Sequence, residues 1–192
     1  MTVPARVAVV VYPDVDELDA VGVLAPLLKA AELGAPVEPV LVAAAPAPTG
    51  AAGLTFPAAR DLAGLASAAA VVVPGGRGAG RAALDVRLCA ALASAGERGV
   101  RLYGVCTGVV VLAAAGLVRG RRVAVHARKH DLLRGSGARE VGAGLVRDGD
   151  LTTVGGAPAD RLKGLDIALA VLEDLCPDVV GPLTQRLEVR AP

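Results

Sequence analysis

Residues 102–109 read LYGVCTGV, an apolar run that meets a glycine-flanked cysteine, Cys106, and continues into a second apolar segment. The run over 101–105 predicts a buried strand, and residues 107–117, which are apolar almost all round, predict a buried helix. Gly104 and Gly108 stand two residues before and after Cys106, in the G-x-C-x-G arrangement of a nucleophile elbow. The chain reverses so sharply at such a turn that a Cβ atom at either glycine would clash.

Cys106 is the residue on which any chemistry is expected to centre. At the start of a helix, free N–H groups and the helix dipole favour a thiolate. Such placement lowers a thiol pKa from about 8.5 to roughly 3.5–7.5, so we expect a nucleophile at neutral pH. The alternative is a small buried cysteine packed between glycines, but both glycines and the strand–helix context favour the nucleophile. Cys89 and Cys176 fall inside helical apolar patterns and are interpreted as packing residues.

On both sides of this unit, short β-branched runs alternate with longer stretches rich in Ala and Leu. The alternation is typical of a mostly parallel central sheet with helices on both faces, so we expect a flavodoxin-like, three-layer α/β sandwich. No repeat or linker divides the sequence, and residues 1–192 are interpreted as one domain. Strands are predicted at 7–12, 37–44, 69–73, 101–105, 123–125, 140–146 and 151–154, helices at 18–33, 82–98, 107–117 and 165–175, and an edge hairpin at 50–56.

The composition argues against several classes of partner. Lys and Arg total 20 and Asp and Glu total 19, so there is no broad basic field for nucleic acid. Aromatic residues make up 2%, which leaves few surfaces for stacking bases. The apolar run over 7–12 is too short to span a membrane and is followed at once by acidic residues. Three cysteines at long spacings exclude a complete disulfide framework, and we expect a reduced, cytoplasmic protein.

A nucleophile needs a proton partner and a place for developing negative charge. The strand over 7–12 should end on the same rim of the sheet as Cys106. Four acids follow it, each able to protonate a substrate, cap the next helix or face water: Asp14, Asp16, Glu17 and Asp19. The strand over 69–73 ends at Gly75 and Gly76, whose backbone N–H groups either approach a ligand or belong to a plain tight turn.

Two further features suggest a cofactor at first sight. His126 and His130 are the two histidines, four residues apart at the start of a predicted helix. Because no third ligand is clustered with them, we favour a site-lining or structural role over a metal pair and expect no metal. The glycine-rich run over 75–80 has neither the G-x-G-x-x-G register nor a Lys-Ser/Thr pair, so nucleotide binding is weakly supported and no cofactor is expected.

The region around Cys106 resembles the ThiJ/PfpI superfamily, whose fold is that of the class I glutamine amidotransferases. The residues that carry the resemblance are CTG at 106–108, VLAAAGL at 111–117, GRR at 120–122 and His126. The branch that the sequence resembles most contains the isocyanide hydratases and the amidase-like domains of certain transcriptional regulators. Leu18-Asp19 with Gly22 resembles its acid-bearing segment, VPGG at 73–76 resembles its oxyanion-side turn, and 148–149, 155–156 and 164–169 resemble its C-terminal third.

This resemblance spans nearly the whole chain and implies a set of roles. It implies catalytic roles for Cys106, Asp19 and Thr107, and oxyanion or substrate binding at Gly75, Gly76 and His126. It also implies a small-molecule substrate and a homodimer.

The sequence departs from the family pattern at several positions. Thr107 stands where the intracellular proteases of the superfamily carry His, and the late H-x-E of the class I amidotransferases is absent. Val23 and Ala127 stand where the branch usually has Pro and Trp, and Asp160–Lys163 is an insertion where the family lines its pocket. No helix-turn-helix segment of the kind that the regulators append is present, so DNA binding is the weakest hypothesis. The departures keep the cysteine chemistry and leave the substrate open.

Three hypotheses follow. The first is a hydratase that adds water to a small electrophilic carbon through a covalent intermediate on Cys106, with conversion of an isocyanide to an N-substituted formamide as the leading reaction. The second is glyoxalase- or deglycase-like action on reactive aldehydes with the same cysteine. The third is a non-catalytic sensor in which Cys106 is oxidised or a ligand binds. Loss of Asp19 should stop turnover in an enzyme and change only the oxidation rate in a sensor.

Overall fold

The computed structural model describes residues 3–155 and 162–190. Its main sheet has six strands in the order β2-β1-β3-β4-β8-β7, in which only β7 runs antiparallel to its neighbour. The strands are β1 (Ala5–Val10), β2 (Val37–Val42), β3 (Ala70–Val73), β4 (Arg101–Val105), β7 (Gly144–Asp148) and β8 (Leu151–Gly155). A separate parallel pair contains β5 (Arg122–Ala124) and β6 (Glu140–Gly142). The predicted α/β fold with a mostly parallel sheet is confirmed.

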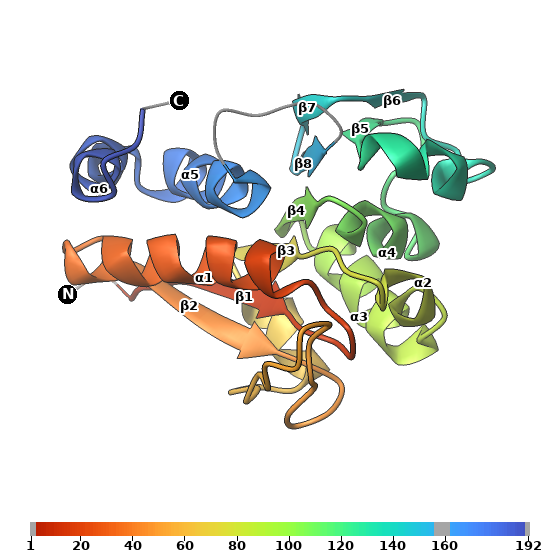
Figure 1. The fold of residues 1–192 in the computed structure, drawn as a ribbon, viewed down its shortest axis with the longest axis horizontal. Helices are drawn as coiled ribbons and strands as arrows, with labels where there is room; N and C mark the ends of the chain where they lie inside the picture. Colours follow the sequence, from red (N-terminus) through yellow and green to blue (C-terminus); the bar gives the residue numbers. More distant parts are fainter. Residues whose placement is uncertain (1–2, 156–161, 191–192) are drawn as a thin grey trace.

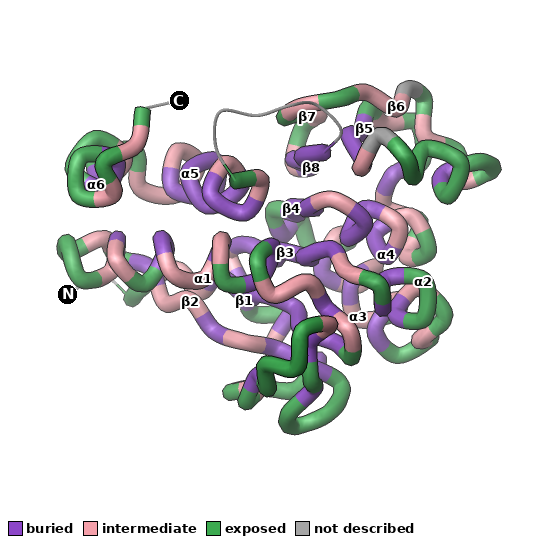
Figure 2. The backbone as a smooth tube through the Cα atoms, viewed as in Figure 1, coloured by how far each residue is buried: buried purple, intermediate pink, exposed green. Residues whose placement is uncertain are grey.

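Helices cover both faces of this sheet (Figure 1). One face carries α1 (Glu17–Glu32), α5 (Lys163–Leu175) and α6 (Val180–Arg186), and the other carries α3 (Val86–Glu97), α4 (Gly108–Ala114) and the 3-10 helix η1 (Leu62–Ser67). The remaining short helices are α2 (Ala79–Ala82), η2 (Ala127–Leu133) and η3 (Pro177–Val179). Alternate β1 side chains enter opposite layers: Val7 and Val9 pack with α1 and α5, and Ala8 and Val10 pack with α3 and α4. Figure 2 shows the buried residues gathered along the strands and the inner helix faces.

Some predicted elements are wrong in detail. The helix predicted over 82–98 begins later, at Val86, because Asp85 caps α3 by accepting hydrogen bonds from the N–H groups of Arg87 (2.9 Å) and Leu88 (3.1 Å). The strand predicted over 140–146 divides near Gly144, whose φ of 72° lies in the left-handed region, so that β6 pairs with β5 and β7 with β8. The segment 50–56 holds no strand and contributes one isolated bridge, between Thr49 and Thr55. Helix α6 was not predicted.

The strand order places a crevice at one rim of the sheet. After β1 the chain forms β2 on one side and then returns to form β3 on the other side of β1. In doubly wound sheets, ligands bind outside the carboxyl ends of the strands at such a switch point. The segments that follow β1, β3 and β4 carry Asp19, Gly75 and Cys106, so the fold brings the predicted site residues to one edge.

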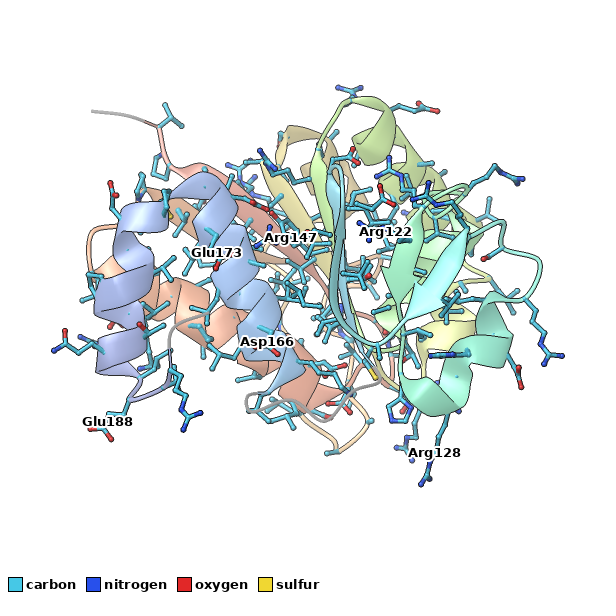
Figure 3. The ribbon with its side chains drawn as sticks, turned by 90° about the horizontal axis from the view of Figure 1, so that it is seen from above. Arg122, Arg128, Arg147, Asp166, Glu173 and Glu188 are labelled. Atoms are coloured by element: carbon cyan, nitrogen blue, oxygen red, sulfur yellow. The ribbon has the colours of Figure 1, made fainter. Side chains whose placement is uncertain are left out.

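The C-terminal end of α5 is fixed to the sheet by polar contacts. The Tyr103 hydroxyl of β4 donates a hydrogen bond to Asp174 (2.6 Å), and Arg147 of β7 donates to both carboxylate oxygens of Asp174 (3.0 and 3.1 Å). Arg147 also pairs with Glu173, and the two side chains lie close together in Figure 3. These bonds hold α5 in one position above β4 and β8.

Within the described ranges, no helix has the length and apolar character needed to cross a membrane.

Two adjacent leucines of α1, one buried and one exposed, allow the orientation of this helix on the sheet to be tested. Leu27 is 0% exposed in the core cluster that also contains residues of β1 and α5, whereas Leu28 is 45% exposed. We expect Leu27→Ala to lower the free energy of unfolding by about 2–5 kcal/mol, because it leaves a cavity in the layer between helix and sheet. Leu28→Ala, the matched control, should cost less than about 1 kcal/mol. Urea denaturation measures both; equal costs would contradict the orientation of α1.

Candidate active site

Cys106 occupies a strained backbone position directly after β4. Its φ is 55°, in the left-handed region that costs a non-glycine residue about 1–3 kcal/mol. Its N–H donates to the Val154 carbonyl (2.8 Å), which fixes the end of the strand. A Cβ on Gly108 would lie 2.0 Å from the Val73 carbonyl oxygen, and one on Gly104 would lie 2.8 Å from Cγ2 of Val109. The sharp strand–helix turn predicted from G-x-C-x-G is therefore present, and both glycines are sterically required.

The four acids that follow β1 have different roles. Asp14 pairs with Arg81, and Glu17 accepts hydrogen bonds from the N–H groups of Ala52 (2.7 Å) and Leu54 (3.4 Å). Asp16 caps α1 by accepting from the N–H groups of Leu18 (2.9 Å) and Asp19 (3.1 Å). Asp19 alone among the four is buried, with 9% of its surface exposed. The structure thus separates Asp19 from its neighbours, which sequence position alone did not do.

Asp19 is held beneath the turn that follows β3. Its Oδ2 accepts a hydrogen bond from the N–H of Gly75 (3.2 Å). Burial, together with the nearby charge of Asp16, raises the pKa of Asp19 to about 6, against the lowering effects of Lys163 and the Gly75 N–H. A carboxyl group of this strength exchanges protons near neutral pH, as a general acid–base must.

Thr107 and Gly76 form a reciprocal pair. The Gly76 N–H donates to Oγ1 of Thr107 (2.9 Å), and that hydroxyl donates to the Gly76 carbonyl (3.1 Å). The N–H groups of Gly75 and Gly76, expected to bind a developing oxyanion, therefore already have acceptors on Asp19 and Thr107. A Cβ on Gly75 would lie 2.7 Å from Oδ2 of Asp19 and 2.9 Å from the nitrogen of Thr107. In this arrangement the glycine turn positions the two side chains.

The expected lowering of the Cys106 pKa is wrong. Burial, and next the charge of Asp19, raise the pKa of the Cys106 thiol above its ordinary value. Lys163 and the Thr107 N–H act in the opposite direction, but they do not outweigh burial. The prediction considered the helix terminus and omitted the cost of placing an anion in a half-buried site beside a carboxylate.

An open pocket of about 370 Å³ adjoins the sulfur. Its lining includes Asp16, Gly76, Cys106 and His126, so it joins residues from four separate segments. His126 caps η2: its Nδ1 accepts a hydrogen bond from the Arg128 N–H (3.2 Å). Burial and the neighbouring cations, Lys163 first, lower the pKa of His126, which favours the neutral imidazole. His126 thus lines the pocket and caps η2.

Lys163 is a site residue that the sequence analysis did not identify. Its Nζ donates to Sγ of Cys106 at 3.7 Å. The one available signal was the insertion at Asp160–Lys163, which pointed to the pocket without assigning a role. Asp160 and Arg161 lie outside the described residues. Across the part of the chain that the structure describes, no three His, Cys, Asp or Glu side chains are grouped as a metal site requires.

Comparisons with known proteins agree with this geometry. The model of the DJ-1/PfpI family matches residues 5–171. Over 105 residues the chain is 40% identical to the isonitrile hydratase of Pseudomonas putida, a match that covers 55% of this chain and 44% of the hydratase. The aligned region therefore spans less than half the length of that relative.

Solved structures give the same picture of the fold. The chain is similar to a ThiJ/PfpI family protein from Pseudomonas syringae, with a TM-score of 0.85 and 26% identity, over 98% of this chain and 76% of the other. It is also similar in fold to Drosophila melanogaster DJ-1beta, with a TM-score of 0.84 and 20% identity, over 97% and 99% of the two chains.

The effect of Asp19 on the thiol can be measured without a substrate. Since the Asp19 charge raises the pKa of Cys106, Asp19→Asn should lower that pKa and speed alkylation of Cys106 by iodoacetamide at pH 7, by about threefold or more. Mass spectrometry after brief labelling gives the rate at each of the three cysteines. Asp14→Asn, which removes a charge paired with Arg81, is the control and should leave the rate unchanged. Slower labelling of the Asp19 variant would refute the coupling.

Proposed function

This chain belongs to the DJ-1/PfpI family, and we propose that it is an enzyme whose Cys106 attacks a small electrophilic substrate. The observation that carries the proposal is the strained Cys106 beside an open pocket, next to a buried carboxyl group whose pKa is near 6. A purely structural cysteine requires neither a left-handed backbone nor an adjacent proton donor.

We propose an isocyanide as the substrate and an N-substituted formamide as the product. Similarity to the P. putida isonitrile hydratase over 105 residues supports this choice. The matched region does not cover the whole of that relative, so the support comes equally from the pairing of Cys106 with Asp19. An isocyanide needs both groups, because the carbon that accepts the nucleophile must then also accept a proton.

The proposed reaction balances with these two groups and one water. The Cys106 thiolate forms a bond to the terminal carbon, and the Asp19 carboxylic acid protonates that carbon, which gives a thioimidate. The Asp19 carboxylate then takes a proton from water as the hydroxide adds to the same carbon, and this proton passes to the nitrogen. When the carbon–sulfur bond breaks, the new hydroxyl returns its proton to Asp19, and the formamide and the thiolate are released.

Purified protein with an alkyl or aryl isocyanide provides the test. Formamide should form with the wild type and not with Cys106→Ala, since the mechanism has no second nucleophile. Asp19→Asn should reduce turnover by roughly a hundredfold or more, the scale for loss of a general acid–base. The same variant should be alkylated faster at Cys106 than the wild type. Slower turnover together with faster alkylation would show that Asp19 acts in catalysis and not by making the thiol more reactive.

Two results would contradict the proposed isocyanide hydratase activity. If the wild type makes no formamide above the Cys106→Ala background but consumes glyoxal-type aldehydes, the glyoxalase- or deglycase-like hypothesis replaces it. If neither substrate is consumed while peroxide oxidises Cys106 selectively, the sensor hypothesis replaces it.

We also propose that the protein acts in the cytoplasm, where the three free cysteines stay reduced.

We propose in addition that the protein is a homodimer. An apolar groove of about 600 Å³ lies between α1 and the start of α5, and Leu18, Val21 and Leu162 are exposed along it. Exposed apolar surface of this kind is typical of protein interfaces. Light scattering at micromolar concentration should give twice the chain mass, and Leu18→Glu should reduce it. A monomer mass for the wild type would refute the dimer.

A further inference from the structure

We infer that the Lys163 ammonium is the counter-ion of the Cys106 thiolate and holds negative charge on sulfur while Asp19 carries the proton. Lys163 is thus a positioning residue for the proposed cysteine chemistry, on which the inference rests. It acts through Cys106 and has no assigned contact with substrate.

The contact itself is direct. Nζ of Lys163 lies 3.7 Å from Sγ of Cys106, within hydrogen-bond distance for sulfur, and the lysine is partly buried. The charge of Lys163 acts on three groups of the site, because it has a lowering effect on the pKa values of Asp19, Cys106 and His126. Lys163 therefore faces the site.

Close helix packing explains why a lysine at this point of the chain reaches the sulfur. Lys163 is the first residue of α5, and the next residue, Gly164, lies against α1. A Cβ on Gly164 would lie 2.9 Å from the carbonyl oxygen of Asp19 and 2.9 Å from the carbonyl carbon of Gly22. The backbones of the two helices thus touch beside Asp19. With Asp174 anchored at the other end of α5, the lysine backbone is held next to both partners.

The titratable and charged groups that face Cys106 come from every neighbouring element. They are Asp16 and Asp19 of the α1 region, Tyr12 after β1, Arg77 after β3, His126 and Lys129 of the η2 region, and Lys163 of α5. Among them, Asp19 disfavours the thiolate and Lys163 favours it. Arg77 and Lys129 are exposed on the pocket wall, and Arg77 donates to the Ala51 carbonyl (2.6 Å). Among the residues that the structure describes, Lys163 is the cation in contact with the Cys106 sulfur.

A single proton then moves between two arrangements of equal total charge. In one, the sulfur is a thiol and Asp19 is a carboxylate; in the other, the proton has passed from Sγ to the carboxylate, leaving a thiolate and a carboxylic acid. The ammonium neutralises the one negative charge in both. The second arrangement is the pair that the proposed reaction needs, nucleophile and proton donor together. Without Lys163, each arrangement would leave an uncompensated anion in a half-buried site, which is costly.

The test measures alkylation of Cys106 by iodoacetamide as a function of pH. Iodoacetamide is neutral, so a changed protein charge does not attract or repel it. Lys163→Met should move the midpoint of the pH–rate profile upward by about one pH unit and slow alkylation at pH 7 roughly tenfold. Lys163→Arg should keep a profile close to wild type, because the cation is retained. Lys129→Met removes an exposed cation from the same pocket and is the matched control, with no change expected.

Two outcomes would overturn the inference: a Lys163→Met profile equal to wild type, or an equal displacement by Lys129→Met, which would indicate a general field and no specific partner. Circular dichroism checks the fold, and Lys163→Gln serves if the methionine variant is unfolded. Because alkylation needs no substrate, the result is independent of the proposed function. If the wild type forms no formamide but the pH–rate profile of Lys163→Met is displaced, the proposed hydratase activity is refuted. The inference that Lys163 is the counter-ion of Cys106 then still stands.

Discussion

The backbone of Cys106 must stay in the left-handed region, and the arrangement of the site depends on this constraint. A residue with a side chain adopts this conformation only where the surrounding structure offsets its energetic cost. Here the close packing around the turn holds Cys106 in place. The absence of side chains at Gly104 and Gly108 lets α4 begin directly against the ends of β3 and β4. The sulfur is thereby presented at the carboxyl edge of the sheet, where the segments following β1 and β3 also end. Longer residues at these two positions would separate the elbow from its neighbours.

The turn at Gly75 has an equivalent function for the polar side chains. Asp19 and Thr107 belong to helical segments on opposite faces of the sheet, and both meet the backbone of this turn. The Tyr12 hydroxyl donates to the Pro74 carbonyl (2.6 Å), and the Asp16 N–H donates to the Gly75 carbonyl (2.8 Å), so the turn is itself tied to the segment after β1. Carboxyl, hydroxyl and thiol groups are thus positioned by backbone contacts.

Local pattern was sufficient to predict the sheet, the elbow and the segments that meet at it, because strand period, glycine spacing and helix caps are encoded by neighbouring residues. Local pattern was insufficient where the role of a residue depends on a contact with a residue distant in sequence. The roles of Asp14, Asp16, Glu17 and Asp19 depend on Arg81, on the N–H groups of Ala52 and Leu54, and on Gly75. The same reason applies to Lys163, which lies 57 positions from Cys106 in sequence, and to the thiol, whose burial no local motif expresses.

The capping residue of α1 has a consequence that extends beyond the helix. The Asp16 carboxylate closes the first turn of α1 and, through its charge, raises the pKa of Asp19. Asparagine caps a helix about as well as aspartate does. Replacement of one carboxylate oxygen of Asp16 by an NH2 group, as in Asp16→Asn, would therefore preserve the helix cap and lower the pKa of the buried Asp19. The chain thus has a route by which natural selection can adapt its chemistry to more acidic surroundings through one partly exposed position, while the nucleophile and the core remain unaltered.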